Sequence, residues 1–283
     1  MCRIFFSFTK EKGSTLTQKR LSEFFKMADN DDIKDGFGIN WLDEQHNKWK
    51  YIKNPIHYLH EPKIFDKINT INNSSRILLV HNRAIHQKMP PIQFSKEKTI
   101  QNTHPICYDE HYIMHHGDLL YESFHELVSN QKSKFSSGMN RNILKEMAIT
   151  NNLSLDGETD TEFILKLFIS NKKKALQSEH KKKDIEDIMI RSFIQTMDFI
   201  QKQSIVNRSN IILTHGDFVI IAKIHLNHTV IAQDDLDLFV DFNTKGIIAS
   251  TYKLTNRAKN MKNNTAFIIN HKMNTIRKFS IQF

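Results

Sequence analysis

The chain has 283 residues, 39% of them hydrophobic, and a formal net charge of +9 at pH 7. This length allows a substantial core in one large domain or two small ones, and no run approaches the roughly 18 apolar residues of a transmembrane helix. The apolar start, IFFSF, is too short for a signal-peptide core, and no small-residue cleavage site follows it. We therefore expect an intracellular, cytoplasmic protein with no membrane partner.

The first half of the chain mixes short apolar runs with amphipathic segments. Runs rich in branched and aromatic residues predict strands, and apolar residues at helical spacing predict helices. SRILLVHNRA is almost continuously apolar, which is typical of a strand buried on both faces. In chain order, we expect a strand at 2–8, a helix at 14–28, two strands within 37–55, strands at 75–84 and 112–117, and a helix at 119–131.

The second half predicts two helices followed by strands. Thr159 and Glu162 have capping-box spacing before the apolar run FILKLFI, so a helix is expected to begin there. A second amphipathic helix is expected at 184–203. Further strands are expected at 210–226, 246–254, 265–271 and 276–283. This order predicts an α+β fold in which helices cover two sheets.

The two cysteines argue against a disulfide-rich protein, and the lysine-rich segment argues against a nucleic-acid-binding protein. Cys2 and Cys107 do not make a disulfide framework in a chain of this length, so both are expected to be free thiols. KKKALQSEHKKK holds six lysines in twelve residues and predicts a solvated basic loop around 170–184. It lacks the arginines and interleaved aromatic residues of a nucleic-acid-binding surface, so we do not expect nucleic acid as a partner.

Cys2 stands directly behind the initiator Met1. If Met1 is removed, Cys2 carries a thiol and a free α-amine on the same residue. The thiol pKa of about 8.5 and the amine pKa of about 8 are nearly matched. The amine can therefore accept the thiol proton and return it to a leaving group, as in an activated nucleophile that carries its own base. Taken alone, without other motifs, Cys2 is better interpreted as an incidental residue.

Several short motifs occur along the chain in a recognisable order. After the initial MCR come DGFGINW at 35–41, HNRA at 81–84, NTHP at 102–105, HHGDL at 115–119 and TDTE at 159–162. Together they resemble the class II glutamine amidotransferase domain, and especially its stand-alone subgroup that begins Met-Cys-Arg. THGD at 214–217 and IIAST at 247–251 are similar to the C-terminal strands of that subgroup. The resemblance thus spans most of the chain.

The resemblance implies an N-terminal-nucleophile fold, a four-layer αββα sandwich of two antiparallel sheets, with residues 1–283 forming a single domain. It implies a hydrolase that converts glutamine, or a related γ-glutamyl amide, to glutamate and ammonia or an amine through a thioester on Cys2. No cofactor is expected. No fused synthase is expected either, so the ammonia acceptor would be a separate enzyme or water.

Two residues match the substrate-binding positions of the family. Arg83 in HNRA corresponds to the arginine that binds the substrate carboxylate, a task that suits the planar guanidinium fork. Asp160 in TDTE corresponds to the aspartate that binds the substrate ammonium. An acidic residue in the first turn of a helix is also favoured by the helix dipole alone, so Asp160 has a structural interpretation as well.

The oxyanion-binding motif departs from the family. The family uses the asparagine side chain and glycine N–H of His-Asn-Gly, whereas this chain has His116 and Gly117 after His115. Gly117 is in place. A histidine ring can donate an N–H, but from a different distance and angle, and loss of one such donor typically costs about 10²–10³ in rate. The following position, often asparagine, is Asp118.

The remaining matches are expected to support the site. Gly36 and Gly38 match the glycine turn beneath it, Arg3 is expected to order the strand of the nucleophile, and His81 and His104 are interpreted as structural or indirectly acting. These five residues complete the predicted set.

Two other functions were weighed. The chain has fifteen histidines, but it has no cysteine pairs at zinc-finger spacing and no HExxH, so no metal site is expected. The alternative from a different class is a catalytically impaired amidotransferase-like fold that acts as a binding or scaffold protein. His116 and the lysine run motivate that alternative.

Overall fold

The computed structural model describes residues 2–61, 63–85, 98–121, 137–157, 159–178, 184–203, 205–226 and 236–282. Within these ranges it contains two antiparallel sheets and five α-helices. The chain divides into two compact units. The first comprises residues 1–105, 114–116 and 236–261, and the second comprises residues 106–113, 117–235 and 262–283.

The first unit contains a seven-stranded sheet in the order β11-β9-β10-β1-β4-β2-β3. Its strands are β1 (Arg3–Thr9), β2 (Phe37–Asp43), β3 (Lys48–Asn54), β4 (Ile77–Asn82), β9 (Phe239–Asn243), β10 (Gly246–Ser250) and β11 (Lys259–Asn260). Its helices are α1 (Thr15–Asn30), the short 3₁₀ helix η1 (Tyr58–His60) and α2 (Ile64–Ser74). Strand β1 therefore has a partner on each side, β10 and β4.

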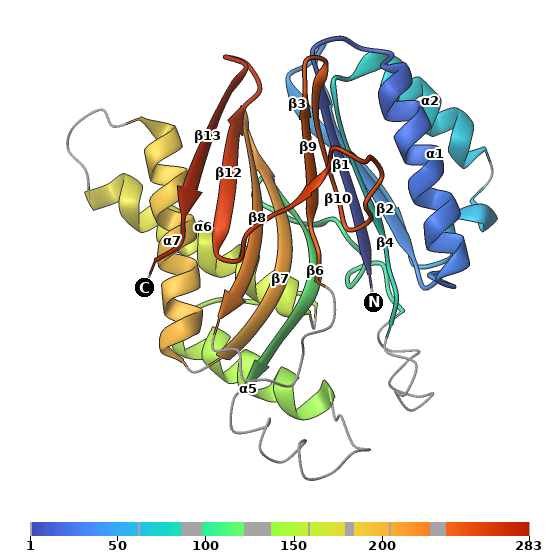
Figure 1. Cartoon of the computed structure of the whole chain (residues 1–283). Coiled ribbons are helices and arrows are strands. Elements are labelled where there is room, and N and C mark those ends of the chain that lie inside the picture. Colours follow the sequence, from blue (N-terminus) through green and yellow to red (C-terminus); the bar gives the residue numbers. More distant parts are fainter. Residues whose placement is uncertain are drawn as a thin grey trace. The chain divides into compact units, whose positions relative to one another are not determined.

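Helices α1 and α2 cover one face of this sheet (Figure 1). Helix α1 begins where the Ser14 side chain accepts a hydrogen bond from the Thr17 N–H, which satisfies one of the unpaired donors of the first turn. Its apolar stripe contributes Phe24, which packs against Phe5 of β1 with ring centroids 5.7 Å apart. Aromatic rings of this size bury large apolar areas, so they fix the helix against the strand that follows Cys2.

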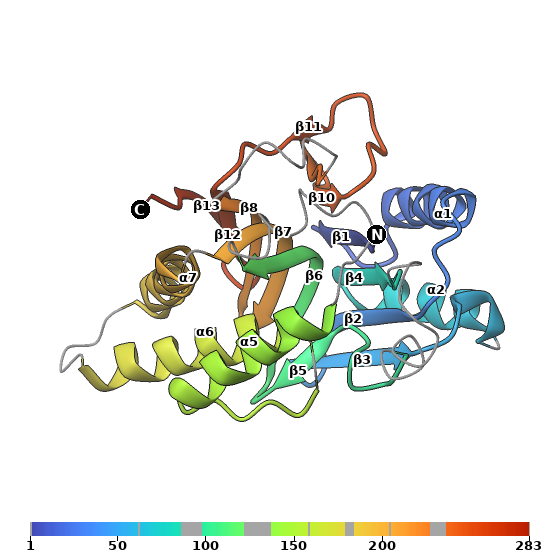
Figure 2. The same ribbon diagram turned by 90° about the horizontal axis from the view of Figure 1, so that it is seen from below.

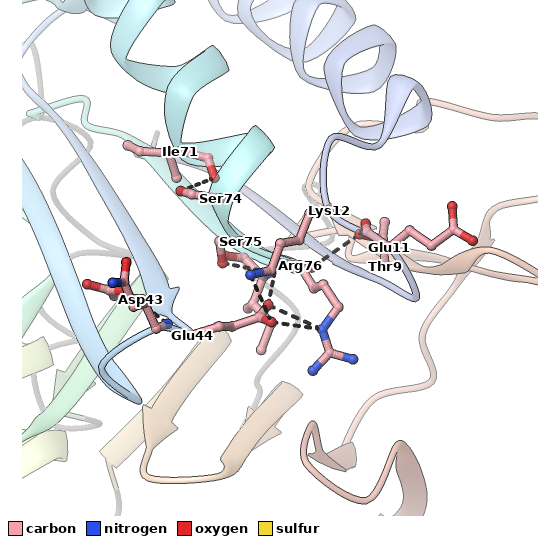
Figure 3. A network of polar contacts seen from close by, with 11 residues as sticks. Thr9, Glu11, Lys12, Asp43, Glu44, Ile71, Ser74, Ser75 and Arg76 are labelled. Carbon is pink, nitrogen blue, oxygen red and sulfur yellow. Dashed lines mark hydrogen bonds and ion pairs between the residues drawn. The ribbon is translucent and has the colours of Figure 1, made fainter.

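A polar network fixes the end of this sheet farthest from Cys2 along β1 (Figure 3). The Glu44 carboxylate accepts hydrogen bonds from the backbone N–H of Arg76, at 2.8 Å, and from its guanidinium. The Arg76 carbonyl in turn accepts from the Thr9 N–H at 2.9 Å. A register slip of one residue would turn every side chain of a strand to the other face. The network therefore helps to decide which side chains of β1 share a face with Cys2.

The second unit contains a six-stranded sheet in the order β13-β12-β8-β7-β6-β5, except that residues 114–116 of β6 belong to the first unit. Its strands are β5 (Ile106–Tyr108), β6 (His111–Tyr121), β7 (Ile205–His215), β8 (Phe218–Leu226), β12 (Thr265–Asn270) and β13 (Thr275–Ser280). Its helices are α5 (Ser137–Thr150), α6 (Asp160–Ser178) and α7 (Ile185–Lys202). Figure 2 shows α6 and α7 beside this sheet, and their apolar residues, such as Phe168 and Phe193, join its strands in one buried cluster.

Most of the predicted elements are present. The strand at 2–8, the helix at 14–28, the strand pair within 37–55 and the helix at 184–203 are confirmed to within a few residues, as are the four C-terminal strand regions. The helix predicted at 119–131 is wrong at its start, because residues 119–121 continue β6. The rest of that segment, 122–131, lies outside the described residues.

The predicted basic loop is also wrong over the part that the structure describes. Lys172 to Ser178 continue helix α6, and residues 179–183 lie outside the described ranges. Lysine is a good helix former, and Lys172 is buried, with its Nζ 3.0 Å from His111 Nε2. A tertiary contact therefore takes one lysine of the run out of solvent.

One of the two hydrogen bonds of the predicted capping box at the start of α6 is present. The Thr159 hydroxyl accepts from the Glu162 N–H at 3.1 Å, as predicted. The Glu162 carboxylate does not fold back to Thr159; it accepts from the N–H groups of Asp156 and Gly157. Among the described residues, no helix is both long and apolar enough to cross a membrane.

Candidate active site

Cys2 lies directly before β1, next to the end of β4. The register pairs Arg3 with Asn82 and Ile4 with His81. If the pairing is extended by one residue beyond Arg3 and Asn82, Cys2 lies opposite Arg83. The Cys2 thiol lies 3.6 Å from the carbonyl oxygen of Ala84, the residue after Arg83. Neither Cys2 nor Cys107 is in a disulfide, as predicted, and both are partly exposed.

Arg3 holds the backbone of Cys2. Its guanidinium donates to the Cys2 carbonyl at 3.3 Å and to the Asp31 carboxylate at 2.9 Å, and it lies over the Tyr252 ring at 5.0 Å. Burial alone would raise the pKa of Asp31, but hydrogen bonds from Tyr252 and Arg3 outweigh burial and lower it. Asp31 is therefore ionised at neutral pH and anchors Arg3. No signal in the local sequence identified Asp31 or Tyr252.

Arg83 is buried, with 6% of its surface exposed. Its backbone forms two hydrogen bonds with the residues just before β2. Its N–H donates to the Gly36 carbonyl at 2.7 Å, and its carbonyl accepts from the Asp35 N–H at 2.9 Å. The Asp35 carboxylate accepts from the Ile85 N–H at 2.8 Å. The predicted glycine turn at Gly36 therefore meets the predicted carboxylate-binding arginine directly.

Gly38 is required by a close approach of backbone. A Cβ at position 38 would lie 1.8 Å from the carbonyl oxygen of His104, a distance that no side chain tolerates. The His104 ring stacks on the His81 ring, with centroids 4.1 Å apart and an angle of 28° between the planes. Gly38, His81 and His104 thus form one buried contact, and the structural role predicted for all three agrees with it.

His116 is buried, and it belongs to the first unit, which also contains Arg3 and His81. Burial, reinforced by the nearby charge of Arg3, holds the pKa of His116 well below its usual range. Its ring is therefore neutral at physiological pH, and a neutral imidazole has one N–H to donate.

Gly117 and Asp160 lie in the second unit. Gly117 has φ of +148°, and a Cβ there would meet the Arg208 carbonyl of β7 at 1.8 Å, so only glycine suits this position. Asp160 is the first residue of α6, and its carboxylate accepts from the Leu119 N–H at 3.0 Å and from the Thr161 N–H at 2.8 Å. The side chain of Asp118 lies outside the described part of the structure.

Three solved structures resemble the whole of this chain. One is the glutamine phosphoribosylpyrophosphate amidotransferase of B. subtilis complexed with ADP and GMP, with a TM-score of 0.61 and 11% identity. A second is described as the allosteric regulatory enzyme of purine biosynthesis, with a TM-score of 0.62 and 10% identity. The third is a glutamine aminotransferase class-II domain protein from Silicibacter pomeroyi, with a TM-score of 0.54 and 12% identity. Each match covers 100% of this chain.

The chain has the fold of the class II glutamine amidotransferases. The predicted α+β class with two antiparallel sheets is confirmed. The chain covers 50% and 49% of the first two proteins and 100% of the third, so it spans about half the length of the two larger amidotransferase-fold proteins. No protein-family model and no curated protein sequence matches it.

Within this amidotransferase fold, the first unit brings together eight of the ten predicted site residues, and the second unit holds the other two, Gly117 and Asp160. The eight are Cys2, Arg3, Gly36, Gly38, His81, Arg83, His104 and His116. Among the described residues, no group of three or more histidine, cysteine, aspartate or glutamate side chains is arranged to hold a metal ion.

Proposed function

We propose that the protein is an N-terminal cysteine amidohydrolase that cleaves the side-chain amide of glutamine, or of a related γ-glutamyl amide, to glutamate and ammonia or an amine. The main support is the position of Cys2 directly before β1 and beside Arg83, in a chain with the amidotransferase fold. A nucleophile and a carboxylate-binding cation then lie at neighbouring ends of two paired strands, an arrangement that suits cleavage of a small amino-acid amide.

In the proposed reaction, Met1 is first removed, so that the α-amine of Cys2 is free. The amine takes the thiol proton, and the sulfur attacks the amide carbon to form a tetrahedral oxyanion. The C–N bond then breaks, and the protonated amine returns the proton to the leaving ammonia. Water attacks the resulting thioester, with the same amine as base, and releases glutamate and the free thiol.

The oxyanion would be stabilised by N–H groups at the His116–Gly117 segment. A neutral His116 can donate one hydrogen bond without bringing a charge that competes for the amine proton. Donors that are fixed in place before the reaction contribute most to such stabilisation. The burial of His116 favours a fixed ring.

Substrate recognition would use Arg83 for the α-carboxylate and Asp160 for the α-ammonium. A buried guanidinium is a strong carboxylate ligand because it offers two parallel hydrogen bonds. The acceptor of the ammonia, a separate enzyme or water, remains a prediction, as does the cytoplasmic location.

The test is mass spectrometry of the purified protein before and after exposure to a diazoketone analogue of glutamine. We expect a mature chain that begins at Cys2, one covalent adduct on its sulfur, and ammonia release from glutamine. Cys2→Ala should abolish both adduct and release, whereas Cys107→Ala, the matched control for the other free thiol, should preserve them.

Retention of Met1 in the native protein would exclude the amine-base mechanism. A trimmed chain that gives neither adduct nor ammonia would favour the scaffold alternative. In that case His116 in place of asparagine would be the first substitution to examine.

A further inference from the structure

His81 connects two distant segments of the first unit. It lies on β4, two residues before Arg83, and its Nε2–H donates to the carbonyl oxygen of His115 at 3.1 Å. His115 immediately precedes His116, the proposed oxyanion donor. One side chain on the arginine strand therefore holds the backbone of the oxyanion segment.

The direction of this hydrogen bond fixes the state of the ring. A carbonyl oxygen can only accept, so Nε2 carries the proton, and Nδ1 is unprotonated in the neutral ring. The ring is fully buried, and burial lowers the pKa of His81 to about 3. His81 thus presents one donor, aimed at one acceptor, over the whole physiological pH range.

The orientation of the His81 ring is set by its neighbours on β1 and β2. The register pairs His81 with Ile4 on one side and with Gly38 on the other. Because Gly38 has no side chain, the backbone of His104 approaches β2 closely, and the His104 ring stacks on His81. Gly38 and His104 therefore restrict the rotation of the ring that would move its donor away from His115.

Stabilisation of the fold explains this arrangement poorly. Among the described residues, Nδ1 of His81 has no protein hydrogen-bond partner although it is buried. A net gain of about 1 kcal/mol from one hydrogen bond is comparable to the cost of burying such an acceptor. The neighbouring β4 positions, Leu79 and Val80, show that this part of the sheet accommodates apolar side chains.

We propose that His81 is a positioning residue: its hydrogen bond to the His115 carbonyl sets the place of His116, and Gly38 and His104 hold His81 in that orientation. This inference rests on the proposed function, because it assigns His116 to the oxyanion. A displacement of about 1 Å at a catalytic group can cost about 10²-fold in rate.

The test compares two substitutions of similar bulk. His81→Gln keeps an N–H near the position of Nε2, whereas His81→Leu removes it. We expect His81→Leu to lower kcat for glutamine about 10- to 100-fold with KM changed less than about threefold, and His81→Gln to restore most of kcat. His111→Leu is the matched control, because His111 is a buried histidine of the second unit that the mechanism does not use; it should leave kcat near that of the unsubstituted protein.

A spectroscopic measurement separates this inference from the proposed function. Ring ¹⁵N spectra of histidine-labelled Cys2→Ala protein should show His81 as the Nε2–H form. The ring resonances of His116 should move in His81→Leu but not in His81→Gln. Unchanged His116 resonances in His81→Leu, or a kcat that His81→Gln fails to restore, would overturn the positioning role. If glutamine is not cleaved and Cys2 is not labelled, the proposed function fails, while the ¹⁵N result still decides whether His81 positions His116.

Discussion

The carboxylate of Asp160 accepts a hydrogen bond from the backbone N–H of Leu119 at 3.0 Å. This bond ties the first residue of α6 to β6, two residues beyond Gly117. The same carboxylate also accepts from the Thr161 N–H. Asp160 thus has a clear structural role, and its proposed contact with the substrate ammonium has to be tested separately from that role.

Asp160→Asn separates the two roles. Asparagine keeps an oxygen that can accept from Leu119 but loses the negative charge, so we expect KM for glutamine to rise at least about tenfold while the melting temperature changes little. Steady-state kinetics and thermal unfolding measure the two effects. Asp156→Asn is the control, because Asp156 is a more exposed carboxylate that pairs with Lys166 near the start of the same helix. A lower melting temperature with unchanged KM would leave Asp160 a purely structural role.

Arg83→Lys keeps the positive charge but loses the planar fork. We expect KM for glutamine to rise about 10- to 100-fold with kcat less affected, because carboxylate binding is lost while the nucleophile is unchanged. The control is Arg76→Lys. Arg76 is a partly buried arginine just before the start of β4, and it pairs with Glu44. If both variants behave alike, the effect belongs to the strand and not to substrate binding.

His116 gives the sharpest test of the oxyanion assignment. His116→Phe removes the ring N–H and should lower kcat about 10²–10³-fold. His116→Asn supplies an amide donor and should retain more activity than His116→Phe. Thermal unfolding must show both variants folded. Equal kcat values in the two variants would remove position 116 from the oxyanion site.

Acid should destabilise the fold steeply. Burial lowers the pKa of His81 to about 3, and burial is also the main cause that lowers the pKa of His111 to about 3. Because unfolded histidines titrate near pH 6.5, the unfolded chain binds more protons between pH 6.5 and 3. The stability is therefore full above about pH 6.5 and is lost as the pH falls through this window. Denaturant unfolding at several pH values measures how the free energy of unfolding changes with pH. His111→Gln should reduce this dependence between pH 6.5 and 3, whereas His46→Gln, at an exposed site, should not.

We expect Lys172 to make the free energy of unfolding rise with pH in the alkaline range. Burial lowers its pKa to about 8, with the charge of Asp109 opposing the shift and that of Lys173 adding to it. Between about pH 8 and 10.5 the unfolded chain binds more protons, so its contribution to the free energy of unfolding rises with pH and is lost below about 8. Comparison of Lys172→Met with Lys174→Met, an exposed neighbour on the same helix, isolates this contribution. Equal pH slopes in the two variants would contradict it.

The elements that sequence predicted well have strong local patterns. The apolar run at β4 and the capped amphipathic segment at α1 specify their own structure, since the pattern alone decides which residues are buried. Helix α2 was missed although Ile64, Ile68 and Ile71 lie on one face, because the three asparagines of this segment, at 69, 72 and 73, favour turns and loops. Local pattern was therefore sufficient only where polar residues did not contradict it.

The sequence motifs named candidate site residues but could not predict the contacts that these residues make. The motifs pointed to Cys2, Arg83 and His116, whereas the bond from His81 to His115 joins residues 34 positions apart. Likewise, the burial of Lys172 depends on His111, 61 positions away. Such contacts depend on tertiary packing, which no short motif encodes.

The central place of β1 in its sheet has a consequence for biosynthesis. Its two neighbours are formed by residues 77–82 and 246–250, so β1 lacks its second neighbour until residue 250 has been synthesised. Until then one edge of β1 is unpaired. Under the proposed mechanism, this interval would allow an aminopeptidase to remove Met1 before the strand behind Cys2 is enclosed on both sides.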